Sequence, residues 1–80
     1  MKKKLIVFGG EGYIGRVIQD QLKFKYDISS YDNLIYEKDK NIYLKKNNKR
    51  KIILGDIGDK KNIKSVLCNF DYVLILAGIV

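Results

Sequence analysis

Short apolar runs alternate along the chain with segments that repeat their apolar residues at helical spacing. Leu5–Phe8 and Lys51–Leu54 are short apolar runs that end at glycine, a pattern typical of strands buried on both faces of a sheet. Tyr26–Tyr31 also has strand character, and Tyr72–Leu76 is a fourth apolar run, which we expect to form a buried strand. The pattern therefore predicts four strands.

Two segments between these strands have the periodicity of an amphipathic helix. In the first, positions i, i+3, i+4 and i+8 form one apolar stripe, made of Ile14, Val17, Ile18 and Leu22. The polar positions expected to face solvent are Arg16, Gln19, Asp20 and Lys23. In the second, Asp59 is suited to cap the helix, and the expected buried face consists of Ile63, Val66, Leu67 and Phe70. Residues 36–50 carry little periodicity, and a short helix or a long basic loop would both fit them.

Strands that alternate with helices predict an α/β fold, with a parallel sheet and right-handed crossovers. The chain has 80 residues, enough for one small domain. We expect a Rossmann-like sheet truncated to about four strands, in the order strand, helix, strand, strand, helix, strand.

The net charge is +7, and seven of the sixteen basic residues fall between residues 38 and 51. These seven are Lys38, Lys40, Lys45, Lys46, Lys49, Arg50 and Lys51. We favour a solvated connection here. A small basic nucleic-acid-binding module that uses residues 38–51 is the alternative, because Tyr36 and Tyr43 are interleaved with the charges.

The remaining composition restricts the chemistry. The chain has no histidine and one cysteine, Cys68, which lies on the second helical segment, so we expect a small buried hydrophobe rather than a catalytic thiolate. No metal site and no catalytic residue are predicted. Only four apolar residues follow the basic start at Met1–Lys4, too few for a signal-peptide core, so a cytoplasmic location is expected.

Glycines are concentrated directly after the first predicted strand. Gly10, Gly12 and Gly15 fit the pattern G-x-G-x-x-G between a strand and an amphipathic helix. In that pattern the first glycine permits a tight turn, the second lets a pyrophosphate approach the backbone, and the third lets the helix lie close to its strand. The free amides at the helix N-terminus then bind the phosphates. A P-loop is disfavoured, because no Gly-Lys-Ser/Thr closes the run.

Asp32 ends the second predicted strand, 20 residues after Gly12. An acid at this place accepts hydrogen bonds from the adenosine ribose hydroxyls and repels a 2′-phosphate, so we predict NAD rather than NADP. Arg16 and Lys38 would weaken that preference if either reached the same pocket.

With these residues assembled, the chain resembles the N-terminal half of the extended short-chain dehydrogenase/reductase family, the NAD-dependent epimerases and dehydratases. The segment from Gly9 to Gly15 is similar to the family's G-x-x-G-[FY]-[IL]-G turn, which includes Gly9, Gly10, Gly12, Tyr13, Ile14 and Gly15. Asp32-Asn33-Leu34 resembles the D-N-L after the second strand. The family usually has threonine where Phe8 stands, and histidine is common where Ile75 stands.

Two further landmarks extend this resemblance over nearly the whole chain. The segment from Gly55 to Asp59 resembles G-D-[IL]-x-D, in which Asp56 and Ile57 would frame the adenine. The segment from Asp71 to Gly78 resembles the family's fourth strand, and its residues Leu76, Ala77 and Gly78 would line the cofactor cleft.

The resemblance implies that residues 1–80 are an incomplete NAD(P)-binding half-domain of an oxidoreductase, with a nucleotide sugar as the substrate of a full-length parent. The family's catalytic Tyr-x-x-x-Lys lies beyond the fourth strand, so whether the chain is an enzyme stays open, and we expect it to be inactive alone. Tyr36 and Lys40 match that spacing, which we attribute to chance. A third hypothesis is a structural half-domain that docks or self-associates through an exposed sheet edge.

Overall fold

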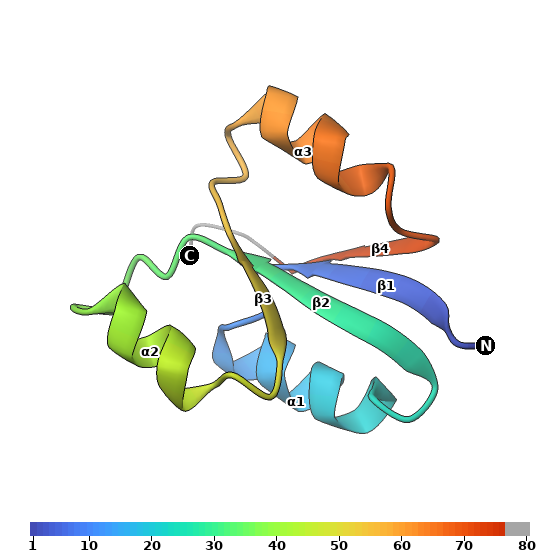
Figure 1. Ribbon diagram of the computed structural model, residues 1–80, viewed down its shortest axis with the longest axis horizontal. Helices are drawn as coiled ribbons and strands as arrows, with labels where there is room; N and C mark the ends of the chain where they lie inside the picture. Colours follow the sequence, from blue (N-terminus) through green and yellow to red (C-terminus); the bar gives the residue numbers. More distant parts are fainter. Residues whose placement is uncertain (77–80) are drawn as a thin grey trace.

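The computed structural model describes residues 1–76, and their four strands form one parallel sheet. The strands are β1 (Lys3–Phe8), β2 (Tyr26–Asp32), β3 (Lys51–Leu54) and β4 (Tyr72–Ile75). They lie side by side in the order β3-β2-β1-β4 (Figure 1). This order corresponds to the first four strands of the Rossmann fold, so the predicted fold class is confirmed.

Three helices cover the sheet: α1 (Tyr13–Leu22), α2 (Lys40–Lys46) and α3 (Lys60–Leu67). Figure 1 shows α3 on one side of the sheet and α1 and α2 on the other. Asp59 caps α3 as predicted, since its Oδ1 accepts a hydrogen bond from the Asn62 N–H at 3.2 Å. Within residues 1–76, no helix has both the length and the apolar character needed to cross a membrane.

The core lies against β1 and β2, the two strands that have a neighbour on both sides. Ile6 and Phe8 of β1 and Tyr31 of β2 form the buried cluster under α3. The rings of Phe8 and Tyr31 pack with centroids 4.9 Å apart. Around them pack Ile53 and the four residues predicted as the inner face of the second helical segment, Ile63, Val66, Leu67 and Phe70. That prediction is confirmed.

The prediction for the inner face of α1 is wrong in part. Ile14 and Val17 are exposed, whereas Gly15 and Gln19 are buried. Gln19, which was expected in solvent, donates from Nε2 to the Gly10 carbonyl oxygen at 2.6 Å. Because Gly15 has no side chain, the helix approaches the preceding turn on its Gly15–Gln19 face, and that close approach outweighs the burial of the apolar stripe.

Two other expectations of burial are wrong. Cys68 is exposed, because it ends α3 at the C-cap instead of lying on the inner face. Tyr72, Val73 and Ile75 of β4 are also exposed. Within residues 1–76, β4 pairs only with β1, so its outer edge has no covering strand. Self-association through this edge stays a prediction.

Candidate functional site

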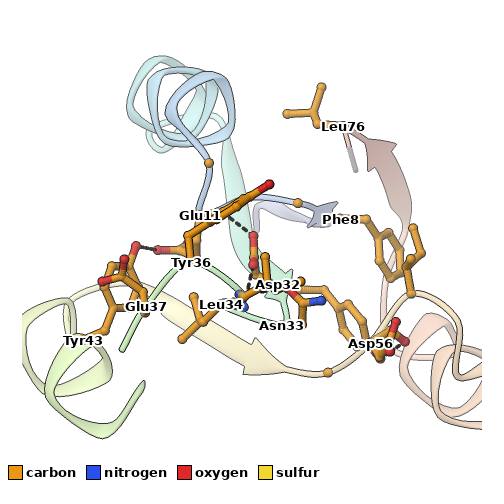
Figure 2. Close-up of a pocket in the computed structure, with 16 residues that line it drawn as sticks. Phe8, Glu11, Asp32, Asn33, Leu34, Tyr36, Glu37, Tyr43, Asp56 and Leu76 are labelled. Atoms are coloured by element: carbon orange, nitrogen blue, oxygen red, sulfur yellow. Dashed lines mark hydrogen bonds between the residues drawn. The ribbon is translucent and has the colours of Figure 1, made fainter. Parts of the chain in front are cut away.

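A pocket of about 510 Å³ lies at the carboxyl ends of the strands (Figure 2). The chain turns from β1 toward β2 and β3 on one side, while β4 lies on the other, so the strand order reverses beside β1. In open α/β sheets, ligands bind at such a switch point. The strand register places Phe8 beside Tyr31, and Asp32 beside Leu54, so the ends of β1, β2 and β3 meet in one place.

The glycine turn forms one wall of this pocket. Gly9 has a φ of 79°, which an L residue adopts only with strain, and its N–H donates to the Tyr31 carbonyl oxygen at 2.8 Å. A Cβ on Gly15 would lie 2.7 Å from three backbone atoms of Gly10, so the helix could not keep its position. Gly12 differs, because a Cβ there would meet only the Gly9 carbonyl oxygen, at 3.6 Å. Its open side therefore faces space that a ligand can use.

The first turn of α1 begins at Gly12, which makes no side-chain cap hydrogen bond. Helix N-termini carry amide donors without intrahelical partners and a partial positive charge, which suit a phosphate group. Gly12, the N-cap of α1, lines the pocket, so the helix begins beside it. The glycine turn thus leaves backbone atoms without side chains at this wall of the pocket.

Asp32 lies in the middle of the pocket, between Glu11 and Leu34 (Figure 2). Its Oδ2 accepts from the Glu11 N–H at 3.1 Å, and its Oδ1 accepts from the Leu34 N–H at 2.8 Å. Leu34 is held at a φ of 54°, and the Asn33 side chain accepts from the Ile35 N–H at 3.1 Å. Each carboxylate oxygen can accept more than one hydrogen bond, so Asp32 fixes the turn and can still accept from a ligand.

The loop after β3 forms the opposite wall, and it is held from below by Tyr31. The Tyr31 hydroxyl donates to the Asp56 carbonyl oxygen at 3.1 Å and accepts from Asn62 Nδ2 at 2.8 Å. A side chain on Gly55 would collide with the Tyr31 ring and hydroxyl, so glycine is required there. Ile57 and Asp56 line the pocket, as expected.

Glu11 is a site residue that the sequence did not indicate. Its side chain is only 2% exposed, and its Oε1 accepts from the Tyr43 hydroxyl at 2.6 Å and from the Arg50 guanidinium. Burial by itself would raise the pKa of Glu11, but the hydrogen bonds from Arg50 and Tyr43 outweigh it and hold that pKa below 4.5. Burial and the Glu11 carboxylate raise the pKa of Tyr43 to about 12. The cluster joins the glycine turn to α2 and to the start of β3.

The structure brings most of the predicted residues together. Those that line the pocket are Gly9, Gly12, Asp32, Asn33, Asp56, Ile57 and Leu76. Gly10, Tyr13, Ile14 and Gly15 belong to the turn and the first turn of α1, beside the pocket but not among its lining residues. Ala77 and Gly78 fall outside the described residues. The sequence did not indicate a pocket role for the lining residues Phe8, Glu11, Tyr31, Leu34, Ile35, Tyr36, Glu37, Tyr43 and Gly55.

The charge of the lining is opposite to that of the chain. Four acids line the pocket, namely Glu11, Asp32, Glu37 and Asp56, and no lysine or arginine does among the lining residues of the described part. Arg16 and Lys38, considered above as groups that would tolerate a 2′-phosphate, are both outside the lining. Tyr36 lines the pocket, whereas Lys40 is the first residue of α2 and does not.

Residues 6–80 match the model of the 3-beta hydroxysteroid dehydrogenase/isomerase family. Among solved structures, a UDP-N-acetylglucosamine 4-epimerase from Methanobrevibacter ruminantium M1, in complex with UDP-N-acetylmuramic acid, is 33% identical over 100% of this chain, with a TM-score of 0.74. An epimerase from the thermophilic pseudomurein-containing methanogen Methanothermobacter thermautotrophicus is 26% identical over 98% of this chain, with a TM-score of 0.69.

A dTDP-glucose 4,6-dehydratase from Bacillus anthracis str. Ames, in complex with NAD, shares the fold at 21% identity, with a TM-score of 0.68 over 96% of this chain. The chain covers 26% of the Methanobrevibacter epimerase, 23% of the Methanothermobacter epimerase and 27% of the Bacillus dehydratase. It therefore spans about a quarter of their length. These similarities do not favour the alternative of a nucleic-acid-binding module.

Proposed function

The chain belongs to the 3-beta hydroxysteroid dehydrogenase/isomerase family, within the NAD-dependent epimerases and dehydratases, and we propose that residues 1–80 are its NAD-binding half-domain. The parent activity that we propose is that of an epimerase- or dehydratase-type oxidoreductase acting on a nucleotide sugar. The two neighbours described as a UDP-N-acetylglucosamine epimerase and a dTDP-glucose dehydratase support that substrate class.

The observation that carries the proposal is the open Gly12 face beside Asp32. The turn has room at Gly12 for a pyrophosphate and none at Gly15 for a side chain, which is the division of roles that a dinucleotide requires. Gly10, Tyr13, Ile14 and the other turn residues would present backbone donors to the phosphates, whereas Gly9 donates its N–H to Tyr31 and would shape the turn.

Asp32 would accept from the adenosine ribose hydroxyls, with Asn33 beside it. Asp56 and Ile57 would frame the adenine, and Leu76, followed by Ala77 and Gly78, would line the cleft toward the nicotinamide. The acidic lining supports NAD over NADP, since a 2′-phosphate would meet carboxylates and no compensating lysine or arginine among the described lining residues.

The bound nicotinamide would supply hydride chemistry, and this part of the chain would bind and orient it. Tyr36 and Lys40 are not assigned a catalytic role, because Lys40 lies outside the pocket lining. Apart from Tyr36 and Lys40, the 80 residues contain no Tyr-x-x-x-Lys. We therefore propose that the catalytic groups belong to a longer polypeptide.

Calorimetric titration of NAD into the wild-type full chain and Asp32→Ala tests the proposal. We expect the variant to bind at least about tenfold more weakly, because a hydrogen bond to a charged acceptor contributes about 1.5–3 kcal/mol. Asp20→Ala is the matched control, since Asp20 is an exposed acid outside the pocket that pairs with Lys23. Equal affinities of wild type and Asp32→Ala would refute the ribose assignment, and absence of binding by wild type would refute the proposed function.

A further inference from the structure

Glu11 places a buried carboxylate inside the glycine turn, where the binding of a pyrophosphate does not require one. Its side chain is 98% buried, and its Oε2 has no hydrogen-bond partner among residues 1–76. A buried carboxylate is costly unless it is paired, and Arg50 and Tyr43 supply that pairing through Oε1, while the nearby Ser30 hydroxyl also lowers the Glu11 pKa. Glycine turns of this kind bind phosphates through the backbone, so the carboxylate calls for another explanation.

The Glu11 backbone contacts Asp32 at the end of the pocket assigned above to the ribose. The Glu11 N–H donates to Asp32 Oδ2 at 3.1 Å, and both residues line the same cavity (Figure 2). A phosphate group on the ribose carries between one and two negative charges near neutral pH. Placed beside Asp32, it would enter the pocket that Glu11 and Tyr43 also line. Like charges a few ångströms apart repel strongly in a partly buried site.

Arg50 is the cation that would otherwise attract such a phosphate. Its guanidinium contacts Glu11 Oε1 and lies 3.4 Å from the Tyr43 hydroxyl, and Tyr43 lines the pocket. Because Arg50 is paired with Glu11, the positive charge of Arg50 is compensated beside the pocket. Glu11 therefore acts against an additional phosphate by holding the charge of Arg50 in an ion pair.

We propose that Glu11 is a second specificity-determining residue, which together with Asp32 excludes a dinucleotide phosphorylated on the adenosine ribose. This inference rests on the proposed function. It concerns only the choice between NAD and NADP.

The test is calorimetric titration of NAD and NADP into the full chain, as wild type and as Glu11→Gln. Glutamine keeps an oxygen that accepts from Tyr43 and removes the charge. We expect the ratio of the NADP to the NAD dissociation constant to fall about tenfold, with NAD affinity changed less than about threefold, as for removal of one close charge. Glu37→Gln is the matched control, because Glu37 is an acid of the same pocket but is exposed. In Glu37→Gln the ratio of the two dissociation constants should change less than about threefold, since solvent screens the Glu37 carboxylate.

Equal weakening of NAD and NADP by Glu11→Gln would overturn the inference, because it would reduce Glu11 to a support for the turn. If circular dichroism shows that Glu11→Gln does not fold, the Arg50→Gln variant tests the inference instead. Lys49→Gln is its control, because Lys49 is an exposed neighbour of Arg50. Loss of Arg50 leaves Glu11 uncompensated, so the ratio should rise about tenfold. An unchanged ratio would overturn the inference, whereas wild type that binds neither nucleotide would refute the proposed function itself.

Discussion

Alanine substitutions at Gly12 and Gly15 should separate ligand binding from stability within one turn. At Gly12 the new methyl group would meet only the Gly9 carbonyl oxygen, at 3.6 Å, which is ordinary van der Waals contact. At Gly15 it would lie 2.7 Å from the Cα, carbonyl carbon and carbonyl oxygen of Gly10. The Gly12 methyl group would therefore fill open space beside the turn, whereas the Gly15 methyl group would fill space that the Gly10 backbone already occupies.

The two free energies can be worked from these contacts. Gly12→Ala loses a slightly better N-cap residue and gains about 0.4–1 kcal/mol from a stiffer unfolded chain, so the melting temperature should stay within about 3 °C. Gly15→Ala gains up to about 1 kcal/mol in helix propensity but forces an overpacked contact that costs about 1–3 kcal/mol. The backbone of Gly10 cannot rotate away as a side chain can. We therefore expect a net loss of about 1–2 kcal/mol and a melting temperature lower by about 5–10 °C.

Binding should respond in the opposite order. The Gly12 methyl group would displace a pyrophosphate from the first amides of α1, and each charge-assisted hydrogen bond lost costs about 1.5–3 kcal/mol. Loss of two such bonds raises the NAD dissociation constant about 100-fold or more. Thermal unfolding followed by circular dichroism and calorimetric titration with NAD measure both quantities on the same samples. Wild-type NAD affinity in Gly12→Ala, or a wild-type melting temperature in Gly15→Ala, would refute the reasoning.

Two other predictions concern the supports of the pocket. Tyr31→Phe removes the hydroxyl that donates to the Asp56 carbonyl oxygen and accepts from Asn62, so chemical denaturation should give a free energy of unfolding lower by about 1–3 kcal/mol; unchanged stability would contradict this. The folded-state pKa of Glu11 lies below 4.5, so its pairing with Arg50 adds stability that is complete above that value and is lost as pH falls through the folded pKa. Denaturation at pH 7 and pH 3 should therefore show a smaller loss for Glu11→Gln than for wild type, and equal losses would exclude the ion pair as a source of acid sensitivity.

Features that depend on neighbouring residues were predictable from the sequence. The four strands and the helix cap at Asp59 follow from local composition, and the structure has them. The glycine turn and Asp32 were also predictable, because Gly9 adopts a positive φ, Gly15 leaves room for the backbone of Gly10, and the acid ends a strand beside the turn. The parallel sheet followed from the alternation of strands with helices.

Burial on α1 depended on how closely two backbones approach. The apolar stripe with Ile14 and Val17 predicted one inner face, but the missing side chain of Gly15 turned the helix onto Gln19 instead. A periodicity argument weighs side chains by hydrophobicity and cannot include the space that an absent Cβ leaves. That space exists only once the turn and the helix are packed together.

By itself, the sequence determined the order of the four strands and of helices α1 and α3, the glycine turn and the acid at the end of β2, because each is specified within a few residues of chain. It left open whether residues 36–50 form a loop or the short helix α2 that the structure has. Only the tertiary structure decided that Glu11 meets Tyr43 and Arg50, 32 and 39 residues further along. It also decided that acids line the pocket of a basic chain. The physical reason is that strand order and register bring distant side chains together, and electrostatic pairing depends on their distance in space.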